Sequence, residues 1–150
     1  MRIFLLTLAF LFSIVALGCD MGPKSSRGFS LPDGNVERGR AAFVEFQCNA
    51  CHKASGIDQL VSDDKPELTV ALGGKVSRIK SYGELVTSII NPSHRLAKGY
   101  PADAVQAEGQ SKMKNYNDVM TVSQLIDLVA FLQSQYTLIE YEPTSYPYYY

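Results

Sequence analysis

Residues 48–52 read Cys48-Asn49-Ala50-Cys51-His52, and this stretch defines the site that the rest of the fold has to support. The pattern is C-x-x-C-H, in which a histidine directly follows the second of two closely spaced thiols. Thiols at this spacing can form thioethers with the two vinyl groups on one edge of a porphyrin, which places the histidine at the iron. The stretch therefore predicts one covalently attached haem c, bound through Cys48 and Cys51 and ligated by His52.

Two other uses of a C-x-x-C pair fit the sequence less well. A structural zinc site needs four ligands, and outside the motif the only other cysteine and histidine are Cys19 and His94. A thioredoxin-like dithiol belongs to an alternation of strands and helices, whereas the pattern of this chain is helical. The haem interpretation is therefore preferred over a zinc site or a redox dithiol.

The N-terminus predicts export of the chain. Arg2 is followed by an apolar run from Ile3 to Gly18 that only Thr7 and Ser13 interrupt. This run is shorter than the roughly 20 residues that a membrane-spanning helix needs, and it is typical of a signal peptide. We therefore expect residues 1–18 to be removed and the haem to lie on the periplasmic side of a membrane.

Cys19 directly follows Gly18 and resembles the lipidated cysteine of a bacterial lipoprotein. The alternatives are a plain signal peptide with an incidental cysteine, or an N-terminal helix retained as an anchor. A lipid-anchored protein would carry residues 19–34, which are small and polar, as a flexible tether to the membrane. Residues 35–137 are then the domain, and residues 138–150 form a tail rich in tyrosine and proline. That tail is expected to lie extended on the domain, to dock on a partner or to be a disordered end.

Length and composition agree with one globular domain. The chain has 150 residues, of which 46% are hydrophobic and 19% are charged, and its formal net charge is −1. Lysines and arginines are scattered rather than gathered in a basic stretch, so nucleic acid is not an expected partner.

Helical periodicity and capping signals predict three main helices. The first starts near Val36, after the possible caps Asp33 and Asn35, and is expected to run into Cys48. Residues 53–80 and 92–120 show no long periodic segment, apart from a short helical piece around residues 102–107. Capping boxes open the other two helices, at residues 81–84 before a stop at Pro92, and at residues 121–124 before a helix that continues to about Tyr136.

A six-coordinate haem needs a second axial ligand, and three residues are candidates. Met113 lies in a polar, irregular segment where a methionine has little packing reason to exist, so a thioether ligand explains it best. Met120 lies just before the last helix, where an apolar residue would support the helix start. His94 follows a helix stop and is otherwise a surface histidine. An open axial site is the remaining alternative.

The motifs together resemble the class I (monohaem, bacterial-type) cytochromes c, from about Asn35 to Tyr136. The similarity lies in the spacing of Gly39 and Phe43 in the first helix and in the sequence of residues 127–132, Asp-Leu-Val-Ala-Phe-Leu, in the last. The resemblance implies an all-α fold in which N- and C-terminal helices cross beside one haem, with long irregular loops. Gly39 and Phe43 would then pack against Leu128 and Phe131.

The resemblance also implies roles for individual residues. It places Met113 on the axial methionine, although Lys114 replaces the proline that usually follows it. It places Pro66 where a carbonyl accepts the free N–H of the proximal histidine. It also suggests three residues that would contact the haem propionates: Lys75, Arg78 and Tyr82.

The expected function is single-electron transfer between periplasmic or membrane redox proteins, without catalysis. A haem whose two axial positions are filled has no place for a substrate, so electrons would pass through its exposed edge. One alternative is a dedicated haem subunit of a periplasmic oxidoreductase, for example one that oxidises sulfur compounds. A five-coordinate haem sensor or peroxidase is another, and it requires that Met113 does not bind the iron.

Overall fold

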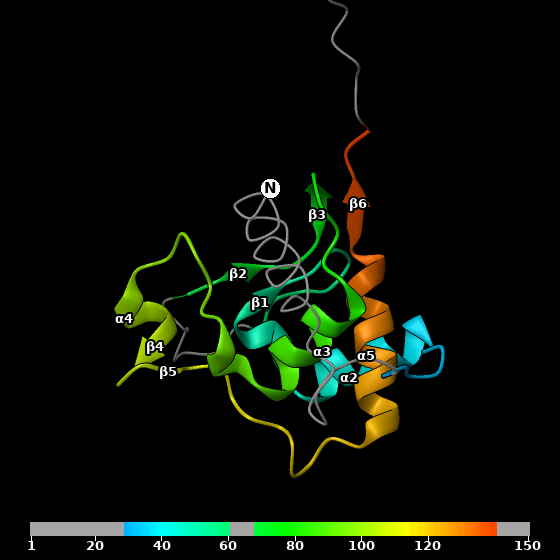
Figure 1. Cartoon of the computed structure of the whole chain (residues 1–150), viewed down its shortest axis with the longest axis horizontal. Coiled ribbons are helices and arrows are strands. Elements are labelled where there is room, and N and C mark those ends of the chain that lie inside the picture. Colours follow the sequence, from blue (N-terminus) through cyan, green and yellow to red (C-terminus); the bar gives the residue numbers. More distant parts are fainter. Residues whose placement is uncertain (1–28, 61–67, 141–150) are drawn as a thin grey trace, which may run out of the picture. The chain divides into compact units, whose positions relative to one another are not determined.

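Helices are the main regular structure of the described residues, and three short strand pairs accompany them (Figure 1). The computed structural model describes residues 29–60 and 68–140. The predicted helical class is confirmed. The elements in chain order are α2 (Val36–Glu45), η1 (Cys48–Ala50), β1 (His52–Lys53), β2 (Val70–Ala71), β3 (Gly74–Val76), α3 (Tyr82–Ile90), η2 (Pro92–His94), α4 (Ala102–Val105), β4 (Gln106–Ala107), β5 (Gln110–Ser111), α5 (Val122–Ser134) and β6 (Tyr136–Leu138).

The core is centred on the crossing of α2 and α5. Gly39 of α2 comes so close to α5 that a Cβ atom at this position would collide with the backbone oxygen of Asp127. One turn further on, Phe43 packs on Phe131 with 5.5 Å between ring centroids. The predicted packing of Gly39 and Phe43 against the last helix is confirmed, and the close approach explains why a glycine stands inside a helix. Leucine, isoleucine and valine side chains of α3 and α5 complete the core: Leu85, Val86, Ile89, Ile126, Leu128, Val129 and Leu132.

Helix α2 ends at Glu45, which corrects the expectation that it would run into Cys48. Asn35 caps its start, where the side-chain oxygen accepts a hydrogen bond from the backbone N–H of Arg38 at 2.8 Å. At its end Gln47 has a φ of 56°, in the left-handed region, and a residue in that conformation cannot continue a right-handed helix. Cys48 therefore opens the 3-10 turn η1 that follows the break, and Cys51 caps the end of that turn.

Both predicted capping boxes are present. Ser81 and Glu84 exchange side-chain-to-backbone hydrogen bonds at the start of α3, and Thr121 and Gln124 do the same at the start of α5. Helix α3 stops before Pro92, as predicted, whereas α5 ends at Ser134 because the chain turns into strand β6. Within the described ranges, none of these helices is long and apolar enough to cross a bilayer.

Short strand pairs tie together the segments that were expected to be irregular. Strands β1 and β2 are parallel and pair His52 with Val70. Strands β3 and β6 are also parallel, and they lie side by side in Figure 1 beyond the end of α5. Strands β4 and β5 form an antiparallel hairpin that lies with α4 away from the α2–α5 crossing (Figure 1). Of these pairs, β1–β2 begins directly after Cys51 and joins the attachment motif to the segment around Val70.

Candidate haem site

The attachment motif lies at the wall of a large cavity within the described residues. Cys48 is half-buried and Cys51 is exposed, so the second thiol faces the open side. The backbone oxygen of Cys51 accepts a hydrogen bond from the N–H of Val70 at 2.8 Å, which fixes the turn against β2. Burial raises the pKa of the Cys48 thiol to about 11, so this thiol is protonated near neutral pH.

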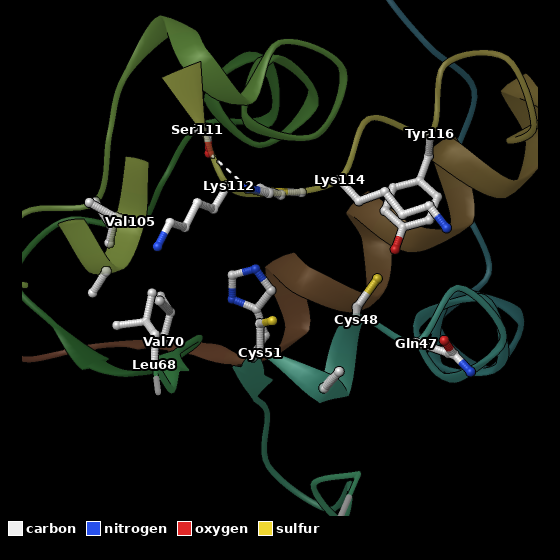
Figure 2. Close-up of a pocket in the computed structure, with 15 residues that line it drawn as sticks. Gln47, Cys48, Cys51, Leu68, Val70, Val105, Ser111, Lys112, Lys114 and Tyr116 are labelled. Carbon is white, nitrogen blue, oxygen red and sulfur yellow. Dashed lines mark hydrogen bonds between the residues drawn. The ribbon is translucent and has the colours of Figure 1, made fainter. Parts of the chain in front are cut away.

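This cavity has a volume of about 590 Å³, and its wall is mainly apolar. In Figure 2, Cys48 and Cys51 lie on one side of it and Ser111, Lys112, Lys114 and Tyr116 on the other. Aliphatic side chains from β2, α4 and neighbouring loops form part of its wall: Leu68, Val70, Ala97, Ala104 and Val105. A second cavity of about 80 Å³ extends toward the core between α3 and α5. A flat apolar group with one edge at the thiols fits this shape.

The three candidates for a second axial ligand differ in their relation to the two cavities. Met113 lines both cavities together with Cys48 and His52. Met120 lines only the smaller, inner cavity, in keeping with a core residue. The Nδ1 atom of His94 lies 2.8 Å from the backbone oxygen of Asn91, and this histidine is exposed outside both cavity walls. The structure thus brings a thioether, an imidazole and both thiols to one space.

Burial gives His52 the electronic state that an iron ligand needs. Desolvation lowers the pKa of the imidazole and outweighs the opposite effect of the Val70 backbone, and the nearby ammonium group of Lys80 lowers it further. The ring is therefore neutral near pH 7 and offers a lone pair. Its Nδ1 atom is buried and has no hydrogen-bond partner among residues 29–60 and 68–140. The predicted partner of this nitrogen, Pro66, lies outside the described residues, as does Cys19.

The residues suggested for the propionates do not line either cavity in the described part of the chain. Lys75 is exposed on β3, and Arg78 forms an ion pair with Glu84 at 2.6 Å. The hydroxyl of Tyr82 is buried and lacks a hydrogen-bond partner among the described residues. Lys80, which the sequence did not single out, lines the inner cavity beside His52. Its position depends on how the loop before α3 folds over the core, and local sequence does not specify this.

Tyr116 is the second site residue that was missed. It lines both cavities, and its hydroxyl donates to the backbone oxygen of Phe46 at 2.7 Å. The two rings pack with 5.4 Å between their centroids. Because this contact joins residues 70 apart in sequence, no local signal could have predicted it.

The residues around the cavity fit haem c. Two thiols, a neutral imidazole and a thioether are the donors that such a group uses, and the apolar wall would shield its ring from water. The family model described as cytochrome c matches residues 36–135, which is more than half of the chain. The chain therefore belongs to the cytochrome c family, and its cofactor is covalently attached haem c.

Membership of this family implies haem-based electron transfer. The searches of curated proteins and of solved structures found no match to the chain.

Proposed function

We propose that this protein carries single electrons between redox proteins, using one haem c that is ligated by His52 and Met113, and that it does not itself transform a substrate. The observation that carries the proposal is the shared position of His52, Met113 and Cys48 on the walls of the same two cavities. When bound, haem c supplies a one-electron couple at its iron. Filling both axial positions leaves electron exchange as the chemistry available.

The residues of the chain set the conditions for that exchange. Cys48 and Cys51 hold the ring covalently, so the cofactor is not lost when partners change. Met113 offers a soft thioether, which favours the reduced state of iron and raises the reduction potential. The apolar wall around Val70 and Val105 excludes water and acts in the same direction, because a low-dielectric site disfavours the extra positive charge of ferric iron.

Redox partners would dock where the cavity opens to the surface. The exposed Cys51 marks this opening, and the exposed Lys112 and Lys114 lie across from it (Figure 2). Two lysines at the rim favour partners that present acidic side chains there. Contacts of this kind are small and short-lived, which suits a carrier that has to leave after each transfer.

The proposed place of work is the periplasmic side of a membrane. The apolar run of residues 3–18 supports export by a signal peptide, and the position of Cys19 supports a lipid anchor. A lipid-anchored carrier would meet its donor and acceptor along the membrane surface, with residues 19–34 as its tether.

The absorption spectrum of the purified ferric holoprotein tests the ligand assignment. A methionine-ligated ferric haem has a weak band at the red end of the visible spectrum, and we expect this band in the native protein. Met113→Ala should abolish it and lower the reduction potential, whereas Met120→Leu should leave both unchanged. Persistence of the band in Met113→Ala would overturn the assignment.

A further inference from the structure

We propose that Ser111 and Tyr116 are positioning residues, which clamp the segment carrying Met113 from both sides and keep its thioether directed into the cavity. The inference rests on the proposed function, because it gives Met113 the role of axial ligand. The bond between Ser111 and Met113 is local, but Ser111 is itself bonded to Ser93 in η2. Tyr116 is bonded to Phe46 at the end of α2, so each anchor depends on a separate element of the fold.

The first anchor lies before Met113. The hydroxyl oxygen of Ser111 accepts a hydrogen bond from the backbone N–H of Met113 at 3.1 Å, which Figure 2 marks with a dashed line. The backbone N–H of Ser111 in turn donates to the hydroxyl of Ser93 in η2 at 3.0 Å. In addition, the N–H of Lys112 donates to the backbone oxygen of Val105 at 2.9 Å. These bonds attach the approach to Met113 to η2 and to the end of α4.

The second anchor lies after Met113. The Tyr116 hydroxyl donates to the backbone oxygen of Phe46, the residue that caps the end of α2 just ahead of the attachment motif. The ammonium nitrogen of Lys114 lies 5.3 Å from the centre of the Tyr116 ring and adds a cation–π contact. The class I resemblance leads one to expect a proline after the axial methionine, where this chain has Lys114. The contact to the Tyr116 ring gives this part of the loop a different restraint from the ring of a proline.

Together, the two anchors restrict the movement of the segment that carries the proposed iron ligand, Met113. Met113 lies between fixed points on η2 and on the end of α2, so its loop can leave the cavity only after breaking a bond at one of them. An anchor of this kind lowers the population of an open loop, in which the iron is accessible to another ligand. Weakening either anchor should therefore make the haem bind external ligands more tightly, because apparent affinity rises with the fraction of open protein.

Imidazole binding to the ferric holoprotein measures this open fraction. Ser111→Ala and Tyr116→Phe each remove one hydrogen bond and should tighten apparent imidazole binding by roughly fivefold. Ser93→Ala should act in the same direction, since it removes the support of Ser111 from outside the loop. As matched controls that remove a hydroxyl elsewhere, Ser77→Ala and Tyr100→Phe should bind imidazole as the native protein does.

The possible outcomes distinguish a failure of this inference from a failure of the proposed function. If native protein shows the red band and Met113→Ala loses it, but the anchor variants bind imidazole within twofold of native protein, the anchors do not position Met113. A lower melting temperature with unchanged imidazole affinity leads to the same conclusion, because a merely structural role would give that result. If native protein binds imidazole as tightly as Met113→Ala does, Met113 is not a ligand and both proposals are wrong.

Discussion

At the scale of the single residue, Gly39 has the most stringent steric requirement among the described glycines. Gly39→Ala would push a Cβ atom into the backbone of Asp127 and force α2 away from α5. We expect a loss of about 1–3 kcal/mol in the free energy of unfolding, typical of overpacking in a core. Chemical denaturation of the holoprotein measures this loss.

Gly83 provides the matched control for Gly39. It also lies within a helix, α3, but a Cβ atom there would meet no heavy atom within 4 Å. Gly83→Ala should therefore be neutral or stabilise the protein by up to about 1 kcal/mol, the difference in helix propensity. Equal destabilisation by the two substitutions would show that the α2–α5 contact is not the cause.

At the scale of the element, a buried carboxylate fastens α2 to α5. Asp127 accepts hydrogen bonds from the N–H of Asn35 at 2.7 Å and from Nε and Nη2 of Arg38 at 2.7 and 3.1 Å. The hydrogen bonds from the Arg38 guanidinium, and then the one from Asn35, hold the pKa of Asp127 below its usual range. One side chain therefore both extends the cap of α2 and completes its ion pair with the last helix.

The stability that Asp127 contributes should depend on pH. A carboxyl group with a depressed pKa stabilises the fold fully above its unfolded pKa, and this contribution is lost as pH falls through the folded value. Asp127→Asn should therefore be less stable than native protein at about pH 7, and the deficit should shrink below about pH 4. Urea denaturation of both proteins across this range measures the deficit, with the exposed Asp118→Asn as control. A deficit that stays constant with pH would rule out the ionic contribution.

Among the helices and strands, some features could be predicted from the sequence and others could not. The capping boxes at Ser81 and Thr121 were predictable because their hydrogen bonds join residues three apart. The crossing at Gly39 was predictable because a glycine inside a helix and a family-like spacing pointed to the same contact. The break of α2 at Gln47 and the pairing of β3 with β6 were not, because a single backbone torsion and contacts between distant segments leave no local pattern.

The residues of the candidate site also fall into those that the sequence could predict and those that it could not. Cys48, Cys51 and His52 belong to one contiguous motif. Met113 could be singled out because it is an apolar residue with a thioether group in an otherwise polar segment. Lys80 and Tyr116 reach the cavity only through the arrangement of loops over the core, so their part in the site becomes visible in the structure alone.

At the scale of the whole molecule, the proposed anchor predicts where the protein is found. Cys19→Ser should move the haem absorbance from the membrane fraction to the soluble periplasmic fraction, because a lipid chain can no longer be attached. Export and haem attachment should persist, since the apolar segment and the C-x-x-C-H motif are unchanged. Retention of the variant in membranes would point instead to an uncleaved N-terminal helix.

The α2–α5 crossing also bears on the order in which the protein matures. The bond between Asn35 and Asp127 joins residues 92 positions apart, and closing so long a segment of chain is a slow, entropically costly step. Until the last helix has been delivered, α2 has no partner for its buried face, and the thiols that follow it are not yet packed into a finished domain. The topology thus leaves an interval, before the C-terminal helix arrives, in which the cysteines are not yet held by the finished domain. Cys51 stays exposed even after that helix has packed.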